Sequence, residues 1–414
     1  MPRTVHIIGA GLAGLSAAVR LAGRGVSIVI HEATEQAGGR CRSYDDAVTG
    51  MRIDNGTHIL LSGNTAALEY LAHIGGMPLV RGAPSARIAF VDLATRERWT
   101  LDLGAGRVPF WMFDKKRRAP GTRAVDYLSL LRLLWPGAEQ PLGKVIACSG
   151  PAYQKVVQPF LLATLNIDPS VASSRLARAV VRETIAAGGN ACRPYVAPKG
   201  LSTAFVEPAI AYLGHHAVSI RFAEQLHRLV FADQAVAGLD FGAGEVALGP
   251  DDAVILAVPT YAASAIVPDL QTPDEYRAII NAHFRIAPPP GLDAMIGVVN
   301  GVAEWIFAFD DRISVTISGA DRFLQHKREE IAEMIWLDVK RVAGIAAELP
   351  PWQIVRERRA TFAATPAQNA RRPGVRTAWR NLALAGDWTD TGLPATIESA
   401  VRSGNRAADF VLQS

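Results

Sequence analysis

Apolar and polar positions along this chain switch between strand-like and helix-like periods, and the first 42 residues show the switch most clearly. A short apolar run at residues 5–8 leads into a glycine-rich turn, and a helix rich in small residues follows. A second apolar run at residues 26–30 ends at Glu32. Short apolar runs bounded by turn glycines are typical of buried parallel strands. This stretch therefore predicts a strand, a helix and a second strand.

The glycines of that turn have the spacing of a dinucleotide-binding loop. Gly9 permits the tight turn, Gly11 lets the backbone approach a pyrophosphate, and Gly14 lets the helix pack closely on the strand. The N-terminus of the helix offers partial positive charge to phosphates, and Glu32 follows at the distance at which a carboxylate accepts from ribose hydroxyls. A glycine turn without a ligand is the alternative, but every flanking element of the motif is present. The predicted contacts of this half are Gly9, Gly11, Leu12, Ala13, Gly14, Glu32 and Ala33.

The rest of the pattern predicts an α/β protein in which two domains are interleaved. Helices are expected at residues 64–73, 153–165, 173–187, 326–342 and 395–411. Strands are expected at 87–92, 98–101, 294–299, 304–309 and 313–318, with a β-meander over 217–259 that returns to the nucleotide sheet. A Rossmann-like nucleotide-binding domain is then assigned to residues 1–78, 198–259 and 366–414, and an α+β substrate domain to 79–197 and 260–365.

Composition and charge narrow the class of protein. The 414 residues are 49% hydrophobic and carry a formal net charge of +4, which does not indicate a nucleic-acid surface. The three cysteines are scattered without a CxxC pair, and no histidine has a metal-ligand spacing, so neither a disulfide framework nor a metal is expected. No apolar run reaches 18 residues, and the nucleotide motif begins too early to leave room for a signal sequence. We expect a cytoplasmic protein.

A second glycine loop and a C-terminal motif extend the nucleotide site. Gly38 and Gly39 permit close backbone approach to a diphosphate, and Arg40 and Arg42 supply charge, although a solvent-exposed turn is the alternative. Near the C-terminus an apolar strand at 382–385 ends in Gly386 and Asp387, and a helix follows. Asp387 can bind a ribitol hydroxyl, and the free N–H groups at the helix start can stabilise negative charge near a flavin ring. These contacts are Gly386, Asp387, Pro394, Ala395, Thr396 and Ile397, and they indicate FAD in preference to NAD.

Two further stretches carry candidate chemistry. The segment 52–60 reads as a strand followed by an Asn-Gly turn, which would bring Gly56, Thr57 and His58 close to a flavin. A lone histidine is more often structural than catalytic, so both roles remain open. Residues 108–135 combine an aromatic cluster, the basic run 115–118 and an apolar stretch. That composition fits a helix on a membrane surface, or a core helix beside a solvated basic loop.

These motifs together resemble the FAD-dependent amine oxidase and phytoene desaturase superfamily, nearly over the full chain. Within it, residues 53–63, 359–366 and 388–400 look like the squalene-associated desaturases of hopanoid synthesis. The resemblance implies FAD as cofactor, with Leu226 among its contacts, and an isoprenoid substrate. It also implies a reductive reaction in which hydroxysqualene loses water and becomes squalene. An acid must help the hydroxyl leave, and His58 and Asp54 are the candidates.

The resemblance leaves other functions open. A carotenoid desaturase uses the same cofactor motifs with electron flow reversed, and a non-catalytic flavin scaffold in a squalene-forming assembly is a further alternative. An amine oxidase is disfavoured because residues 389–393 offer no aromatic cage. A substrate drawn from the bilayer favours the membrane-surface interpretation of 108–135, on the inner face of the cytoplasmic membrane. Because no second GxGxxG motif occurs, electrons would come from an external donor or reductase, or from a nicotinamide that binds transiently at the flavin.

Overall fold

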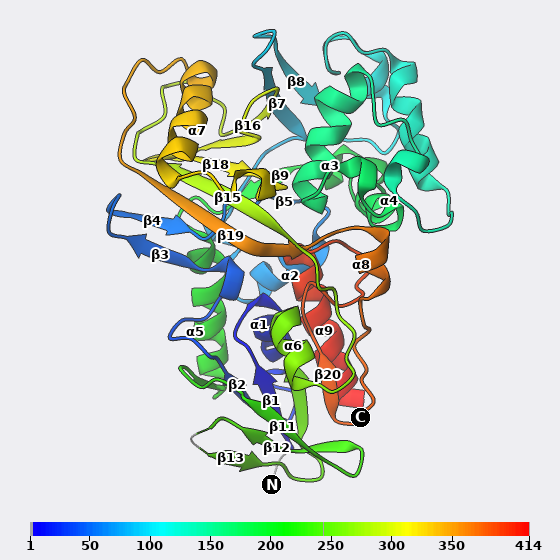
Figure 1. Cartoon of the computed structure of the whole chain (residues 1–414), viewed down its shortest axis with the longest axis vertical. Helices are drawn as coiled ribbons and strands as arrows, with labels where there is room; N and C mark the ends of the chain where they lie inside the picture. Colours follow the sequence, from blue (N-terminus) through cyan, green and yellow to red (C-terminus); the bar gives the residue numbers. More distant parts are fainter. Residues whose placement is uncertain (1–2, 243, 414) are drawn as a thin grey trace.

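The computed structural model describes residues 3–242 and 244–413, which form two lobes stacked along the long axis (Figure 1). The lower lobe is built on a five-stranded parallel sheet in the order β10-β2-β1-β14-β20. Its strands come from distant parts of the chain: β1 (Thr4–Ile8), β2 (Ser27–His31), β10 (Ser219–Arg221), β14 (Ala253–Leu256) and β20 (Leu382–Leu384). The predicted α/β class with a Rossmann-like sheet is confirmed.

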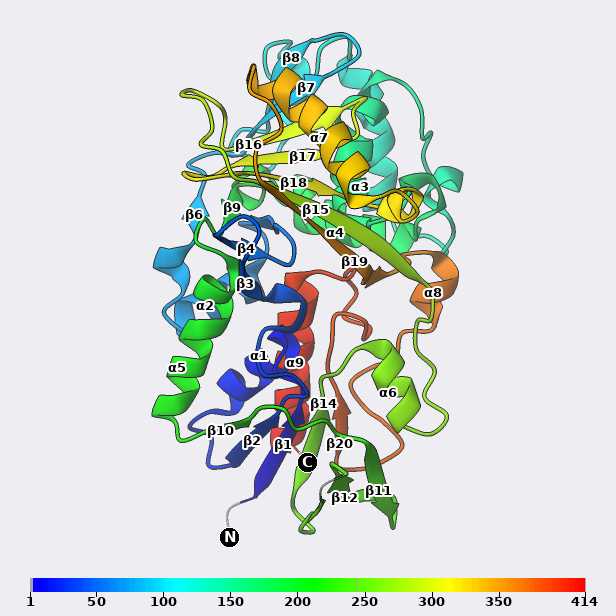
Figure 2. The ribbon, with the colours of Figure 1, turned by 60° about the vertical axis from the view of Figure 1, so that its left-hand side comes forward.

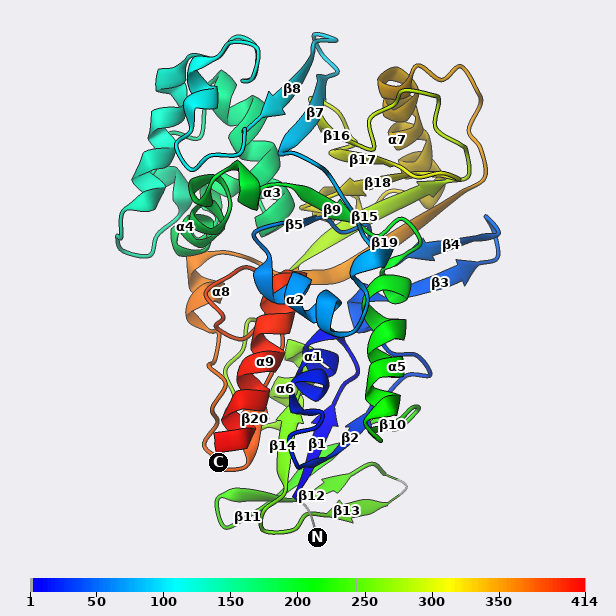
Figure 3. The same ribbon diagram turned by 180° about the vertical axis from the view of Figure 1, so that it is seen from behind.

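Alternate residues of β14 show how this sheet is buried on both faces. Ala253 and Ile255 point into a core formed with α1 (Leu12–Leu21), α2 (Thr65–His73), α5 (Glu207–His215) and α9 (Ile397–Gln413). Val254 and Leu256 point to the opposite face, which packs on other elements. Viewed from behind, α1, α5 and α9 lie side by side along the sheet with α2 above them (Figure 3). Helices α1 and α9 approach so closely that a Cβ on Gly404 would lie 2.2 Å from the carbonyl oxygen of Ala13.

The β-meander expected over 217–259 differs in the structure. The strands β11 (Arg228–Ala232), β12 (Ala235–Asp240) and β13 (Glu245–Ala247) form a separate three-stranded antiparallel sheet. Only β10 and β14, at the two ends of that stretch, pair with the nucleotide sheet. The separate sheet and α6 (Thr260–Ile266) pack on the second face of the nucleotide sheet, where Leu229, Val236 and Leu239 are buried. Turns between short strands predict antiparallel pairing, but not which sheet the strands join.

The upper lobe is built on a seven-stranded sheet in the order β19-β15-β18-β17-β16-β7-β8. Its strands are β7 (Arg87–Asp92), β8 (Arg98–Asp102), β15 (Tyr276–Phe284), β16 (Met295–Val299), β17 (Trp305–Ala308), β18 (Ile313–Ile317) and β19 (Trp352–Phe362). One face is covered by α7 (Arg328–Ala343), and α3 (Gln158–Leu165) and α4 (Ser174–Glu183) lie on the other side of the lobe (Figure 2). The predicted hairpin at 87–101 and the three strands between 294 and 318 are all present.

The two longest strands of this sheet, β15 and β19, were not predicted. In β15 the polar side chains Asn281 and His283 interrupt the apolar run, although both are buried. In β19 three arginines interrupt the pattern, because this strand lies at the edge of the sheet. Edge strands and strands with buried polar contacts lose the alternation on which sequence prediction depends.

Shorter elements connect the two lobes and frame the candidate site. They are β3 (Ser43–Asp46), β4 (Met51–Asp54), β5 (Leu60–Leu61), β6 (Arg81–Gly82), β9 (Pro194–Val196) and α8 (Pro366–Ala370). The segment 108–135 contains two 3₁₀ helices, η3 (Phe110–Phe113) and η4 (Ala124–Leu134). No helix among the described residues is long and apolar enough to cross a membrane.

Candidate cofactor and active site

The three glycines of the turn after β1, where the pyrophosphate is predicted to bind, have different surroundings. Gly9 has φ +105°, and a Cβ there would lie 2.7 Å from the carbonyl oxygen of Ala257. A Cβ on Gly14 would lie 1.9 Å from the carbonyl oxygen of Gly9, so only glycine allows α1 to pack this closely. A Cβ on Gly11, in contrast, would meet nothing within 4 Å. Gly9 and Gly14 are therefore required by the fold, whereas Gly11 leaves open space at the N-terminus of α1.

The acidic residue after β2 lies against this turn. Glu32 accepts a hydrogen bond from the backbone N–H of Ala10 through Oε2, at 2.8 Å. Its other oxygen accepts from the backbone N–H of Thr34 at 2.9 Å and from the Thr34 hydroxyl at 2.8 Å. The carboxylate is thereby fixed next to the glycine turn, where a ribose hydroxyl can reach it. Ala33, also predicted as a contact, is exposed beside it.

Next to Glu32 lies a chain of polar side chains that the sequence analysis missed. His6 Nδ1 lies 3.0 Å from His31 Nε2, and His31 Nδ1 lies 2.5 Å from Glu224 Oε2. The backbone N–H of Glu224 donates to the carbonyl oxygen of Glu32 at 2.9 Å, which holds the loop before β11 against the ribose-binding acid. The predicted contact Leu226 is buried on this same loop. Burial, followed by the proximity of His31, lowers the pKa of His6 to about 4, so His6 is neutral.

The second glycine loop packs directly on the first. The backbone N–H of Gly38 donates to the carbonyl oxygen of Ala10 at 2.8 Å, and Gly38 forms an isolated bridge with Gly11. A Cβ on Gly39, which has φ +56°, would lie 3.4 Å from the Cα of Gly11. Two backbone segments thus meet without side chains at the expected diphosphate position, which fits a dinucleotide better than a solvent-exposed turn.

Arg40 joins the N-terminal half of this site to the C-terminal motif. Its guanidinium donates to Asp387 Oδ1 at 2.6 Å and to the carbonyl oxygen of Ala360 at 2.5 Å. Asp387 follows β20 and is buried, and Gly386 before it has φ +148°. Arg42, two residues further along, is exposed. The structure therefore brings the two predicted halves of the FAD site, 347 residues apart in sequence, into direct contact.

The loop that carries Asp387 depends on an arginine that the sequence analysis also missed. Arg372 is buried and donates to the carbonyl oxygens of Asp387, Trp388 and Thr389. Burial lowers its pKa to about 10, so it still carries its charge at neutral pH. The only sequence signal was an arginine pair before Pro373 in a stretch of mixed polarity.

The start of α9 carries the predicted C-terminal contacts of the FAD site. The predicted contacts Pro394, Ala395, Thr396 and Ile397 lie where the chain enters α9, which begins at Ile397, two residues later than expected. The next residue, Glu398, is buried and accepts from the backbone N–H groups of Ala66 and Ala67 at 3.1 and 2.8 Å. Glu398 therefore caps α2 and fixes it to α9, so that the N–H groups at the start of α9 keep their position.

The segment 55–58 is braced by the large sheet. Asn281 accepts from the backbone N–H of Thr57 at 3.3 Å and donates to the carbonyl oxygen of Asn55 at 3.4 Å. Thr316 donates to Asn281 Oδ1 at 2.8 Å. A Cβ on Gly56 would lie 3.0 Å from Asn281 Nδ2, so the backbone must pass close to this amide. Asn281, one of the polar residues that made β15 hard to predict from the sequence, thus positions the loop that is predicted to face the flavin.

The two candidate acids have different surroundings. Burial, followed by the positive charge of Arg40, lowers the pKa of His58 to about 4, and Asp387 opposes that shift. His58 therefore belongs to the neighbourhood of Arg40 and Asp387. The carboxyl group of Asp54 instead accepts from the Ser43 hydroxyl at 2.6 Å and from the backbone N–H of Leu201 at 2.7 Å. Burial raises the pKa of Asp54, while these hydrogen bonds oppose the rise.

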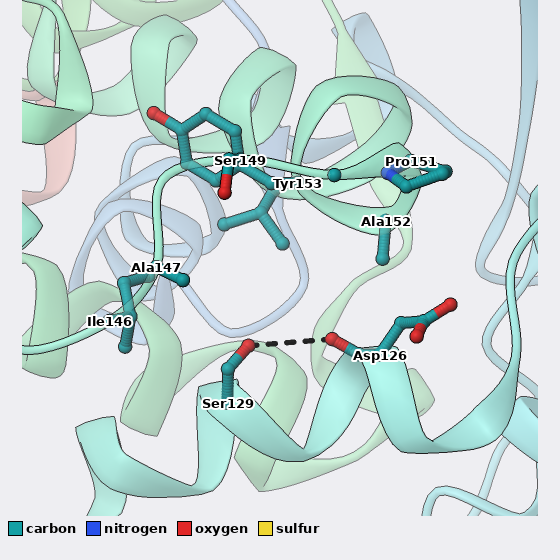
Figure 4. Close-up of a pocket in the computed structure, with 10 residues that line it drawn as sticks. Asp126, Ser129, Ile146, Ala147, Ser149, Pro151, Ala152 and Tyr153 are labelled. Atoms are coloured by element: carbon teal, nitrogen blue, oxygen red, sulfur yellow. Dashed lines mark hydrogen bonds between the residues drawn. The ribbon is translucent and has the colours of Figure 1, made fainter.

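Within residues 3–242 and 244–413, no cluster of three or more His, Cys, Asp or Glu side chains could hold a metal ion. A pocket of about 170 Å³ lies in the helical region and is shared by η4 and residues 146–157. In Figure 4, Asp126 and Ser129 of η4 lie across this pocket from Ala152 and Tyr153. None of its lining residues belongs to the predicted cofactor contacts, so it is separate from the glycine loops.

The fold and the site together define a flavin-binding oxidoreductase. Residues 12–412 match the family model described as flavin containing amine oxidoreductase. The chain is 57% identical over 413 residues to the hydroxysqualene dehydroxylase of Rhodopseudomonas palustris, covering 100% of this chain and 99% of the relative. It is 55% identical over 412 residues to the hydroxysqualene dehydroxylase of Sinorhizobium fredii, covering 100% and 99%.

The chain therefore belongs to the hydroxysqualene dehydroxylases within the flavin containing amine oxidoreductase family, and it is an FAD-dependent oxidoreductase. Among solved structures, it is similar to cyclohexylamine oxidase from Brevibacterium oxydans, with a TM-score of 0.74 over 100% of this chain and 99% of that one. The identity to that protein is 16%, so the similarity concerns the fold.

Proposed function

We propose that this enzyme reduces hydroxysqualene to squalene, with loss of the hydroxyl group as water. The C–O bond breaks, a hydride forms the new C–H bond, and a proton completes the water molecule. Bound FAD, in its reduced form, supplies that hydride. The observation that carries the proposal is the identity of 57% and 55%, over full length, to two proteins named for this reaction.

The upper lobe has the chemistry that a long hydrocarbon requires. Phe90, Trp99, Trp305 and Phe307 are buried on one face of the seven-stranded sheet, in the same apolar core as α3 and α4. This core reaches the lower lobe through Trp388, whose indole N–H donates to the carbonyl oxygen of Val258 at 2.9 Å. An apolar environment that excludes water would prevent water from recapturing the carbon from which the hydroxyl group departs.

The direct test is anaerobic incubation of dithionite-reduced enzyme with hydroxysqualene, phytoene or an amine, followed by product analysis. Squalene formation from hydroxysqualene alone supports the proposal. Desaturation of phytoene by the oxidised enzyme, with no squalene formed by the reduced enzyme, would assign the chain to the carotenoid desaturases instead. Bound FAD that none of these substrates oxidises or reduces would support the scaffold alternative.

Of the two candidate acids, we propose that His58 assists departure of the hydroxyl group, whereas Asp54 holds β4 against the helix that begins near Leu201. Because the pKa of His58 is lowered to about 4, the protonated imidazole becomes more abundant as pH falls from 7 toward 4. We expect turnover of pre-reduced enzyme to rise over that interval. His58→Ala should retain FAD, lose at least about tenfold in turnover and flatten the pH profile, consistent with the usual contribution of a general acid.

The matched control for this prediction is Asp54→Asn. It should lower the melting temperature, because a buried carboxyl group with two hydrogen bonds is altered, but it should keep the slope of the pH profile. Unchanged turnover and an unchanged pH profile in His58→Ala would remove His58 from the proposed role.

We also propose that the segment 108–135 docks on the surface of a lipid bilayer. In η4, which has about three residues per turn, every third side chain shares one face. Tyr127, Leu130 and Leu133 are buried, while Val125, Leu128, Leu131 and Leu134 form an exposed apolar stripe. Phe110 and Phe113 of η3 are each 69% exposed, and Trp135 is 63% exposed. Such a concentration of exposed apolar side chains indicates an interaction surface.

Positively charged side chains next to the exposed apolar stripe indicate which kind of surface would bind it. Lys115 and Lys116 are exposed, whereas Arg117 pairs with Asp102 and Arg118 donates to the carbonyl oxygen of Met112. Aromatic and leucine side chains beside free lysines match an anionic bilayer surface, from which a C30 hydrocarbon would also be collected. These features support peripheral attachment to the membrane.

Vesicle co-sedimentation tests this attachment. Lys115→Gln/Lys116→Gln should weaken binding to anionic vesicles about tenfold or more, since each lysine near such a surface contributes about 1 kcal/mol, and should not affect neutral vesicles. Phe110→Ser/Phe113→Ser/Trp135→Ser should weaken both. Leu337→Ser, at an exposed leucine on α7, is the control. Dimerisation through the stripe, without vesicle binding, would contradict the proposal.

A further inference from the structure

Five arginines gather where β19 passes above the lower lobe, and we refer to them as the β19 arginine patch. They come from three parts of the chain: Arg42 before β3, Arg328 at the start of α7, and Arg356, Arg358 and Arg359 on β19. All except the half-buried Arg356 are exposed. In Figure 1, β19 crosses the waist of the molecule, directly above α1, α6 and α9.

A β-bulge in β19 places Arg358 and Arg359 at the surface. Arg277 of β15 pairs with Thr361, whereas Ile279 pairs with Glu357, so residues 358–360 of β19 lie opposite the single residue Ala278. The extra residues leave both Arg358 and Arg359 exposed, although neighbours in a regular strand point to opposite faces. Bulges of this kind are frequent beside active sites, where they redirect side chains.

The bulge also touches the cofactor site. The carbonyl oxygen of Ala360 accepts from Arg40, which in turn donates to Asp387. On the other side, the guanidinium of Arg359 lies 4.6 Å from the ring centre of Tyr261 and 5.6 Å from that of Tyr276. Arg359 therefore directly precedes Ala360, whose carbonyl oxygen contacts Arg40 of the predicted FAD site.

The charge of the patch is not neutralised within the described residues. No carboxylate of residues 3–242 and 244–413 lies within ion-pair distance of Arg42, Arg328, Arg358 or Arg359. Some arginines elsewhere do pair with carboxylates, as Arg402 does with Glu183 and Glu398. The nearest acid in sequence, Glu357, is hydrogen-bonded by the Asn55 amide at 3.2 Å. Burial, followed by the positive charges of Arg328 and Arg358, lowers the pKa of Arg356, so these cations repel one another, and the nearby Glu329 opposes that shift.

Exposed charges also protect an edge strand against pairing with other strands. That role concerns β19 alone, whereas two of the five arginines, Arg42 and Arg328, lie outside β19. Mutual repulsion costs stability, and a negatively charged partner would relieve it. The spread over three elements fits a protein surface better than a single small anion.

We propose that the β19 arginine patch docks a small acidic electron-carrier protein that reduces the bound FAD. This inference rests on the proposed reductive reaction, which consumes two electrons in each cycle. Two one-electron carriers would dock in succession and be oxidised, and together they would supply the two electrons that FAD needs when bound, with protons from solvent. Since the sequence has no second dinucleotide motif, an external carrier meets a requirement that the chain does not supply itself. Complementary charge would steer the carrier to the site and raise its association rate about 10- to 1,000-fold.

Anaerobic stopped-flow reduction of the FAD-loaded enzyme tests the proposal, with reduced plant-type ferredoxin as the probe. In wild type, the second-order rate constant for loss of flavin absorbance should fall as salt rises, because salt screens the attraction. Arg358→Glu/Arg359→Glu should lower that constant at least tenfold at low salt, and Arg358→Gln/Arg359→Gln should lower it less. The control is Arg24→Glu/Arg380→Glu, two exposed arginines at the far end of the lower lobe.

Reduction by dithionite separates docking from cofactor chemistry, and it should proceed at the same rate in all these variants. Equal, salt-independent ferredoxin rates in wild type and Arg358→Glu/Arg359→Glu would overturn the proposal. The proposal would also be overturned if Arg358→Glu/Arg359→Glu lowered the rate of reduction by dithionite as much as the rate of reduction by ferredoxin. Faster reduction of wild type by NADPH than by ferredoxin would overturn it as well. Squalene formation by dithionite-reduced wild type tests the proposed reaction independently, since it requires no carrier.

Discussion

Replacing Gly11 by valine is expected to leave this protein folded but to remove its FAD. Gly11 has φ −72° and ψ 175°, an extended conformation that valine adopts without strain, and its Cβ would meet nothing within 4 Å. The same open space lies at the N-terminus of α1 and against Gly38 and Gly39, where the pyrophosphate is expected. We expect the dissociation constant for FAD to rise at least about 100-fold, equivalent to about 2.7 kcal/mol.

The flavin-to-protein absorbance ratio and calorimetric titration of apoprotein with FAD measure this effect. The free energy of unfolding of the apoprotein should stay within about 1 kcal/mol of wild type, since no packed contact is altered. Gly14→Ala provides the contrast: its Cβ would lie 1.9 Å from the carbonyl oxygen of Gly9, so loss of FAD should accompany loss of stability. Wild-type FAD affinity in Gly11→Val would contradict the placement of the pyrophosphate.

Replacing Arg372 by methionine is expected to destabilise the protein and weaken FAD binding together. Methionine retains much of the apolar volume over the Phe362 ring but donates no hydrogen bonds, so the carbonyl oxygens of Asp387, Trp388 and Thr389 lose a buried partner. Each unpaired buried group costs about 1–3 kcal/mol, so we expect a loss of about 3 kcal/mol or more. FAD should bind at least about tenfold more weakly, because the loop that holds Asp387 is no longer fixed.

The neighbouring residue supplies a matched control. Arg371 is exposed, pairs with Asp274 at 2.9 Å and donates to the carbonyl oxygen of Thr272 at 2.9 Å, and surface ion pairs of this kind contribute about 0–1 kcal/mol. Arg371→Met should therefore leave the melting temperature and the FAD affinity close to those of wild type. If Arg372→Met melted at the wild-type temperature, the buried hydrogen bonds of Arg372 would not stabilise the 387–391 loop.

The FAD-binding motifs could be predicted from sequence because each one is local. The turn at Gly9, the acid at Glu32 and the Gly-Asp pair at 386–387 each follow a strand that is recognisable from its own apolar run. The bracing of these motifs could not be predicted, because its partners are distant. Asn281 and Thr57 are 224 residues apart, and Arg372 acts on carbonyl groups that any sequence supplies.

The segment 108–135, which we propose as a membrane-docking surface, shows a different limit of sequence analysis. Its composition identified an apolar and basic region, but a helical period of 3.6 residues would not place Val125, Leu128, Leu131 and Leu134 on one face. The 3₁₀ geometry of η4, with three residues per turn, aligns them as a single exposed stripe. The arginines of β19 likewise gave no sequence signal of a strand. In the structure β19 lies at the edge of a sheet, and its arginines reach the protein surface there.

The sequence by itself determined the cofactor, the Rossmann-like sheet and the family, since these depend on short motifs whose conformation is set by glycine and by apolar period. Tertiary structure alone decided how the two halves of the FAD site meet through Arg40 and Asp387, and which polar residues hold the site in place. It also decided that burial, followed by the charge of Arg40, lowers the pKa of the candidate acid His58. Contacts between residues hundreds of positions apart form only when the sheets assemble, so these contacts cannot be predicted from local sequence.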